Sequence, residues 1–563
     1  NNKITFYFYH NQSIILLIYF VIVMKYLKGS YRLLAILFIV NSALLLITNS
    51  YIHPDEQYQS LEPLIKYLNN DFIDNPNGSI TWEYILSEDG VNKPIRSISI
   101  LYMYYGMILK ILLYLYSNLD KINILNIISL LKLYNLSIFT IIFVKFNNLF
   151  NKNNSFNINK SILFMFTSYT LLTYQVRFFS NSIETLLLML TLISMQTENY
   201  LFMSVLIAFG IHNRITFITW LIIPALKLLY KEVIVKKNYK NILVKIPISM
   251  ILTSYLIFKT DSSIYSIENE TFYTPLENIL YNKNSENLSK HGTHSRFTHL
   301  FINNPVLIGP LLLMIIKYKH NLIKSKQSLP ILSAISGILF HSLIPHQEAR
   351  FLIPAIPLLI VSCNYSSIDL KKTKSITKLV FLANIIFNIV MLILMGSLHQ
   401  SGLLTLMKNK KNLSLIENHD IGYWHTLMPL HWPYYITLNE TERNQLYINF
   451  VSDETDPITG FREFDTSLRK INLENQKYNI YDFMGIDSDN LDHLLTQLKT
   501  ENTINQMYLI LPYSFIQTLS SFTQSYEIIE HNPYHLNLND GIDTWPFGLY
   551  SVSYTHLTLP TKA

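Results

Sequence analysis

The chain has 563 residues, of which 50% are apolar and only 15% are charged. Soluble domains carry about 25% charged residues, so this composition excludes a set of ordinary water-exposed domains and favours a lipid-facing protein. The formal net charge of +6 comes without a basic block, which excludes nucleic acid as the expected partner. The single cysteine, Cys363, excludes an intrachain disulfide framework and a cysteine-cluster zinc site.

The N-terminal residues lack the pattern of a confident membrane span. The chain does not open on Met, whereas Met24 is followed by a basic cluster at 25–32 and then by an apolar run. We therefore expect residues 1–23 to be a non-native or upstream leader. Because positive charge collects on the cytoplasmic side of a membrane, the polar segment 49–97 is expected on the lumenal side as a large first loop.

Apolar stretches near spanning length recur through the first 400 residues. A bilayer core about 30 Å thick needs about 20 helical residues, and a helix satisfies its own backbone polar groups. We expect a multi-pass bundle of about ten transmembrane helices over residues 24–400, in which the shorter stretches are tilted or half-spanning. The stretches are 33–48, 98–116, 122–144, 161–174, 183–195, 201–229, 242–258, 305–316, 330–344, 351–363 and 379–398.

The composition changes after residue 400. The segment 401–550 holds about half of the chain's Asp and Glu, interspersed with short apolar runs. This pattern predicts a water-exposed α+β domain of about 150 residues, docked on one face of the membrane, and the family resemblance described below implies that this face is the lumenal one. Residues 551–563 have no obvious connection to what precedes them, and we expect a tail of doubtful origin.

The first candidate site follows the first apolar run, at His53, Pro54, Asp55, Glu56 and Gln57. Proline suits the first turn of a helix, and the two carboxylates suit the positive end of its dipole. The pattern therefore indicates either an ordinary helix start or a general base at the membrane surface.

A second polar group lies in the same loop. Trp82 stands beside Glu83, and Arg96 follows. An aromatic ring next to a carboxylate is a common sugar-binding pair, although an interfacial Trp also serves as a membrane anchor. Arg96 is either a phosphate ligand or a charge at the end of a span.

Ionisable groups also interrupt apolar sequence at Arg177, Glu184 and Arg214. Charges at membrane depth are costly unless they are paired or line a wet cavity, which makes them candidates for a site. An ion pair between Arg177 and Glu184 is the structural alternative.

Two further polar clusters carry the remaining candidates. His294 and Arg296 belong to a run rich in His without a nearby Cys or carboxylate, which favours a cationic cradle for phosphate over a zinc site. His346, Glu348 and Arg350 lie between two apolar stretches, where such groups are expensive without a function.

Taken together, these segments resemble the glycosylphosphatidylinositol (GPI) mannosyltransferases of glycosyltransferase family 22, which are polytopic GT-C enzymes of the endoplasmic reticulum. The resemblance runs from about Met24 to Gly402 and is most similar to the branch that adds the fourth, α-1,2-linked mannose. The motifs that carry it are HPDEQYQSLEP, TWE with P-I-R-S, R-x-x-SNSIE, G-x-x-x-R-x-T-F, NLSKHGTHSR, HQEARFLIPAIPLL and G-x-x-HQSG.

The resemblance implies dolichyl-phosphate-mannose as the donor, a trimannosyl GPI precursor as the acceptor and a lumenal active site. We expect Asp55, with Glu56 second, to act as the general base of an inverting displacement. No nucleotide leaves, so we expect neither a cofactor nor a metal. The phosphate ligands expected are Arg350, His346, Arg296 and His294, and the acceptor-binding or structural residues are His53, Gln57, Trp82, Glu83, Arg96 and Glu348.

Three alternatives stay open on the sequence. The same chemistry suits another mannosyltransferase that uses this donor, for the third GPI mannose or an N-glycan precursor. Many spans with buried charges also suit a membrane transporter, although no internal repeat is evident. An inactive scaffold in a glycosylation complex is the third alternative.

Overall fold

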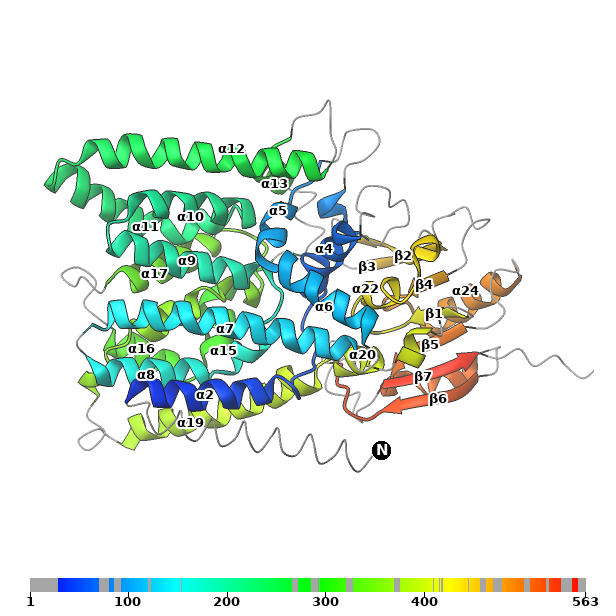
Figure 1. Cartoon of the computed structure of the whole chain (residues 1–563). Helices are drawn as coiled ribbons and strands as arrows, with labels where there is room; N and C mark the ends of the chain where they lie inside the picture. Colours follow the sequence, from blue (N-terminus) through cyan, green and yellow to red (C-terminus); the bar gives the residue numbers. More distant parts are fainter. Residues whose placement is uncertain are drawn as a thin grey trace, which may run out of the picture.

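Helices build most of the chain up to residue 406, and the seven strands of the described residues all follow residue 419 (Figure 1). The mostly helical fold with a smaller mixed domain at its C-terminal end is confirmed. The computed structural model describes residues 29–69, 80–85, 93–119, 123–152, 154–265, 272–284, 292, 294–319, 328–368, 375–408, 410–414, 416, 419–443, 445–455, 462–468, 478–500, 507–522, 526–537 and 549–554.

The expected leader at 1–23 lies outside the described residues. Of the expected tail, residues 551–554 belong to the last strand of the sheet, and the residues after them lie outside the described part.

The longer helices lie side by side across Figure 1 and form a bundle, with the sheet at one end. They are α2 (Ser30–Leu44), α6 (Met107–Asn118), α7 (Ile124–Phe150), α8 (Ser155–Phe166), α9 (Ser180–Gln196), α10 (Tyr200–Asn213), α11 (Phe217–Leu229), α12 (Ile246–Ile264), α17 (Leu329–His341) and α19 (Ser375–Met391). The shorter ones are α3 (Asp55–Tyr58), α4 (Leu61–Leu68), α5 (Ile98–Leu101), α13 (Thr274–Lys283), α15 (Asn304–Ile308), α16 (Leu311–Tyr318), α18 (Ala355–Val361) and α20 (Ser401–Leu406).

Four continuous helical stretches of the described residues are long and apolar enough to cross a membrane: Ile98–Asn118, Ile124–Phe150, Ile242–Ile264 and Ile376–Leu398. A fifth results if the bent pair α15 and α16 counts as one span. Helices α2, α10 and α17 are apolar but shorter. Among the described residues, single helices of spanning length are therefore fewer than the expected ten or so.

The break between the short helices α15 and α16 has a local physical reason. Between α15 and α16 the chain bends by 110°, at Gly309 and Pro310. Gly309 has a φ of +68°, a left-handed conformation that other residues rarely adopt, and the following proline has no N–H for a continuing helix.

Helices on the outside of the bundle turn apolar side chains outward. In α12, Ile251 and Leu256 are 67% and 66% exposed, and α19 carries a similar exposed row that includes Ile385 and Ile389. Contiguous apolar surface on this scale is unstable in water and suits hydrocarbon. The exposed faces therefore support the membrane location of the bundle.

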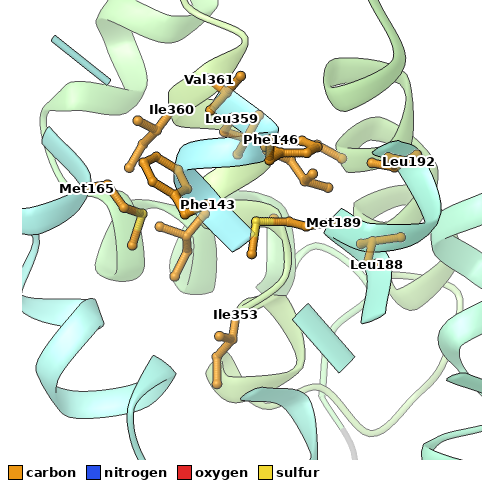
Figure 2. Packing of buried hydrophobic residues seen from close by; sticks show 14 of the residues in the cluster. Phe143, Phe146, Met165, Leu188, Met189, Leu192, Ile353, Leu359, Ile360 and Val361 are labelled. Carbon is orange, nitrogen blue, oxygen red and sulfur yellow. The ribbon is translucent and has the colours of Figure 1, made fainter. Parts of the chain in front are cut away.

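The interior of the bundle is a packed apolar core. Helix α7 begins with a reciprocal capping box, in which the side chains of Asn123 and Asn126 each accept the other residue's backbone N–H (3.0 and 3.1 Å). Its buried face meets α8, α9 and α18, as Figure 2 shows. The core residues labelled there are Phe143, Phe146, Met165, Leu188, Met189, Leu192, Ile353, Leu359, Ile360 and Val361.

The C-terminal domain is built on a seven-stranded sheet with the order β3-β2-β4-β1-β5-β7-β6. The four central strands β2, β4, β1 and β5 are parallel, and the outer pairings are antiparallel. Helix α24 (Ser488–Thr500) connects β4 to β5, and α22 (Trp432–Tyr435) and α23 (Glu440–Arg443) precede β2. The strands are β1 (Asp420–Tyr423), β2 (Leu446–Thr455), β3 (Arg462–Leu468), β4 (Tyr478–Asp482), β5 (Met507–Pro512), β6 (Tyr526–Asn532) and β7 (Leu549–Tyr554).

Helices α3 and α4 connect the bundle to this domain. The buried Glu62 carboxylate accepts the backbone N–H groups of His431 (2.7 Å) and Trp432 (3.1 Å). The Trp432 indole donates to Gln57 Oε1 (3.2 Å), and the Tyr58 hydroxyl donates to the Pro429 carbonyl (2.5 Å). Hydrogen bonds to the C-terminal domain therefore fix the position of the loop around Asp55.

A second connection runs through the segment after α19. The N–H of Leu536 donates to the Leu398 carbonyl (2.9 Å), and the Gln400 N–H donates to the Leu536 carbonyl (3.0 Å). On its other side, the same segment accepts the Tyr51 N–H at the His399 carbonyl (3.0 Å). The sheet domain and the first loop thus share one backbone support.

Candidate active site

The first loop turns into a short helix directly before the leading candidate base. Helix α3 begins at Asp55, immediately after Pro54, and the ring of His53 accepts the Asp55 N–H at Nδ1 (3.2 Å). The helix start predicted from the Pro-Asp-Glu sequence is present. The turn is tied to the sheet domain through Gln57 and Tyr58, which contact Trp432 and Pro429.

Asp55 and Arg350 are in direct contact, although they are far apart in the sequence. Arg350 Nη1 lies 2.5 Å from Asp55 Oδ2, and the Arg350 guanidinium also binds Glu348 through Nε and through Nη2 (3.0 Å). The side chain of Arg350 is 8% exposed and that of Asp55 is 23% exposed. The two segments predicted to act together are therefore on the same side of the bundle and form one cluster.

Two histidines complete this cluster. His346 Nε2 lies 2.7 Å from Glu348 Oε1, and its Nδ1 lies 3.1 Å from the Gly292 carbonyl. His53 Nε2 lies 3.9 Å from Glu348 Oε2. Because both ring nitrogens of His346 face acceptor oxygens, the surroundings favour its doubly protonated form.

The charges determine the protonation of the cluster. Burial raises the pKa of Asp55, but Arg350, together with the smaller effects of His53 and Arg96, outweighs it and holds that pKa below its usual value. Arg350 and His346 likewise hold the pKa of Glu348 well below its range against the effect of burial. The pKa of His346 is raised because Glu348 outweighs burial, whereas burial and Arg350 lower the pKa of His53.

The second candidate base, Glu56, points into a different environment. Its carboxylate is fully buried and pairs with Arg177 (3.2 Å), whose guanidinium also donates to the carbonyl (2.5 Å) and hydroxyl (2.6 Å) of Ser50. The expected pair of Arg177 with Glu184 is wrong, because Glu184 lies beside Arg214 (3.5 Å) instead. The sequence offered the first pairing as a way to neutralise two buried charges, and the packing of the chain decided the second.

The loop residues chosen for the acceptor lie next to Asp55. Gln59 Nε2 donates to Asp55 Oδ2 (2.5 Å) and lies 3.4 Å from Glu83 Oε1. Glu83 in turn pairs with Arg96 (2.9 Å). A continuous polar path therefore leads from the candidate base to the segment that carries Trp82.

Trp82 itself is an accessible aromatic surface. Its side chain is 44% exposed, and its ring packs at 4.5 Å against the ring of Tyr281 from α13. Sequence reasoning selected Trp82 but missed Gln59 and Tyr281. The signal for Gln59 was its position four residues after Asp55, because residues i and i+4 lie on one face of a helix.

The structure separates the remaining predicted residues. His294 is close to the cluster: its Nδ1 accepts the Gln347 N–H (3.3 Å), and its ring lies 5.9 Å from that of His346. Arg296 is exposed and makes no ion pair within the described part of the chain. Gln57 is buried in the contact with Trp432, which points to a structural role.

Within the described ranges, no three His, Cys, Asp or Glu side chains are grouped so that they could hold a metal ion. Metal independence stays a prediction, because the residues left undescribed include part of the His-rich run.

Comparisons with known proteins cover both the bundle and the sheet domain. Residues 32–431 match the Alg9-like mannosyltransferase family. A protein of Candida albicans named GPI mannosyltransferase 4 is 31% identical over 93% of this chain and 99% of its own length. The Saccharomyces cerevisiae protein of the same name is 29% identical over 87% and 93%, respectively. The solved structure of ArnT from Cupriavidus metallidurans bound to undecaprenyl phosphate is 10% identical, with a TM-score of 0.49 over 92% of this chain and 97% of that chain.

Proposed function

The chain belongs to the Alg9-like mannosyltransferase family and transfers mannose in GPI-anchor biosynthesis, and we propose that it adds the fourth mannose. In this proposal, dolichyl-phosphate-mannose is the donor and the third mannose of the GPI precursor is the acceptor, joined by an α-1,2 linkage. The name shared by the relatives supports this branch over the one that adds the third mannose. The family match also leaves no support for the transporter alternative.

The contact between Asp55 and Arg350 is the observation that carries the proposed mechanism. Both substrates have lipid tails, so a site at the membrane surface lets each tail stay in the bilayer while the sugars meet in water. A β-linked donor that gives an α-linked product requires one displacement with inversion. Such a reaction needs a base on the acceptor and a cation on the leaving phosphate, and these two side chains supply both within one cluster.

The proposed reaction is a single displacement at C1 of the donor mannose. The 2-hydroxyl oxygen of the acceptor mannose attacks C1 of the donor mannose, and its proton passes to a carboxylate oxygen of Asp55. The bond between C1 and the phosphate oxygen breaks, and its electron pair leaves with dolichyl phosphate. Arg350 and the protonated His346 stabilise the negative charge on that phosphate, so no general acid is required.

Arg350 also controls how strong a base Asp55 is. Without donor, Arg350 lowers the pKa of Asp55, which keeps the carboxylate ionised but weakly basic. A donor phosphate competes with Asp55 for the same guanidinium. Binding of the donor therefore raises the basicity of Asp55 at the moment when the proton of the acceptor has to be removed.

The proposal also covers the acceptor site and the compartment. Trp82 offers an exposed ring for the C–H groups of a sugar, and the adjacent Glu83 is connected to Asp55 through Gln59 and pairs with Arg96. The proposed location is the membrane of the endoplasmic reticulum, with Asp55 on the lumenal side. The reaction is proposed to need neither a cofactor nor a divalent metal.

The test is transfer by the purified protein in detergent, with dolichyl-phosphate-mannose and a trimannosyl GPI. The expected product has a fourth mannose that an α-1,2-specific mannosidase removes, and its formation persists in a chelator. The matched control is Asp55→Asn, which keeps the shape of the side chain and removes its basicity. A wild-type protein that leaves the acceptor unchanged, or that adds mannose at another hydroxyl, overturns the proposal.

A further inference from the structure

Arg214 lies beside the candidate site although the mechanism above does not use it. It follows the last residue of α10, and its side chain is 10% exposed. Its Cζ lies 5.1 Å from the ring centroid of Phe351, and Cζ of Arg350 lies 5.4 Å from the same ring. Two guanidinium groups therefore contact one aromatic side chain, and one of them holds the candidate base.

The hydrogen bonds of Arg214 are incomplete. A guanidinium has five N–H donors. Arg214 uses one of them, from Nη1 to the Ser180 hydroxyl (2.9 Å), within the described residues. Its Nε lies 3.5 Å from Glu184 but makes no hydrogen bond there. By comparison, the fully buried Arg177 also leaves its Nε without a partner, but its two Nη groups donate to the carbonyl and hydroxyl of Ser50 and to Glu56.

The unused N–H donors of Arg214 are energetically unfavourable in a nearly buried position. A nearly buried cation with unused donors loses water without gaining acceptors, which costs more than leaving it paired or exposed. A negatively charged ligand with several oxygens would both neutralise the buried charge of the guanidinium and accept its unused N–H groups. Phosphate is such a ligand, because arginine binds two of its oxygens through parallel N–H donors.

The neighbouring Arg350 is poorly suited to bind the phosphate alone. Asp55 and Glu348 already neutralise its charge, and Glu348 accepts hydrogen bonds from its Nε and Nη2, although Nη1 makes none. A phosphate bound to Arg350 alone would therefore share that guanidinium with two carboxylates. Arg214 can accept the phosphate without losing a strong partner.

We propose that Arg214 is a second phosphate ligand, which binds the lipid-linked phosphate group beside Phe351 and presents it to Arg350. The ligand class is a lipid monophosphate or its sugar ester, and the inference rests on the proposed function for the identity of that lipid. Arg214 anchors the phosphate, and Arg350 takes up the charge that develops when the sugar leaves.

The competing explanation is that Arg214 only neutralises the buried Glu184. In that case Arg214→Gln destabilises the fold, and adding Glu184→Gln in the same chain repairs both stability and ligand affinity. If Arg214 binds phosphate, the double variant recovers thermal stability but not affinity. Glu184→Gln alone keeps or improves the affinity, because it removes a negative charge near the ligand.

The experiment measures binding of dolichyl phosphate to the purified full chain in detergent, with inorganic phosphate as a second probe. Arg214→Gln and the double variant with Glu184→Gln are each expected to weaken dolichyl phosphate binding about 10- to 100-fold. Arg214→Lys is expected to retain part of the affinity, and inorganic phosphate should compete. Wild-type affinity in the double variant overturns the inference.

Failure of the proposed reaction and failure of the phosphate site give different experimental results. A wild-type protein that binds dolichyl phosphate through Arg214 but transfers no mannose refutes the reaction and leaves the phosphate site standing. A protein that transfers mannose with an unchanged donor KM in the double variant refutes the phosphate site and leaves the reaction standing.

Discussion

Replacing Asp55 by Asn and Glu56 by Gln, one at a time, separates two neighbouring carboxylates that the sequence cannot distinguish. Asp55 is partly accessible and contacts Arg350 and Gln59, whereas Glu56 is fully buried against Arg177. The first substitution is expected to remove activity and preserve the fold. The second is expected to weaken the fold and to preserve the chemistry in the molecules that remain folded.

The magnitudes follow from these surroundings. Loss of a general base costs about 10²- to 10⁴-fold in rate, so Asp55→Asn should reduce kcat by that factor. Removal of one partner from a buried ion pair costs about 3–5 kcal/mol. Glu56→Gln belongs at the lower end of that range, because Arg177 keeps both hydrogen bonds to Ser50. The midpoint of thermal unfolding should fall by several degrees.

The assay combines thermal unfolding in detergent with the rate of mannose transfer per folded molecule. Wild-type protein and Gln57→Asn, a change in the same turn, serve as references. Wild-type turnover by Asp55→Asn would remove that carboxylate from the mechanism. Loss of turnover in a fully stable Glu56→Gln protein would assign the base to Glu56, contrary to the buried ion pair described above.

Three further results are expected. Arg350→Lys should lower kcat/KM at least tenfold in the transfer assay, because a point charge cannot bridge two carboxylates and a phosphate; an unchanged value contradicts the role of Arg350. The Glu348–His346 pair should stabilise the protein most between about pH 4.5 and 6.5. Its contribution disappears as falling pH protonates Glu348, whose pKa is depressed, and as rising pH deprotonates His346, whose pKa is raised. Unfolding midpoints of wild-type and Glu348→Gln protein across pH measure this, and a constant difference refutes it. Gly337→Ala should destabilise the bundle by about 1–3 kcal/mol, because the added Cβ would lie 2.0 Å from the Trp220 ring; unaltered thermal unfolding would show that the ring moves at no cost.

Several features of the fold could be predicted from the sequence because they depend on local chemistry. The low share of charged residues predicted lipid-facing helices, and the acidic composition after residue 400 predicted a separate mixed domain. The sequence Pro54-Asp55 predicted the start of a helix, which α3 confirms. These features depend on composition and on neighbours along the chain, so no knowledge of distant contacts was required.

Span lengths were less predictable, for a physical reason. The apolar stretch 305–316 is present, but the left-handed Gly309 and the following Pro310 divide it into the two short helices α15 and α16. Hydropathy measures how apolar a stretch is, and it does not report where the helical axis bends. The parallel centre of the sheet was likewise beyond composition, because strand order depends on pairings between distant segments.

The sequence by itself determined that charged groups stand at costly positions and that Asp55, Glu56 and Arg350 are worth testing. Only the tertiary structure decided which of these groups are in contact. Arg350 pairs with Asp55 and Glu56 pairs with Arg177, whereas Arg214 has unused N–H donors. The reason is that an ionisable side chain owes its protonation and its accessibility to its neighbours in space. Those neighbours come from helices that are far apart along the chain.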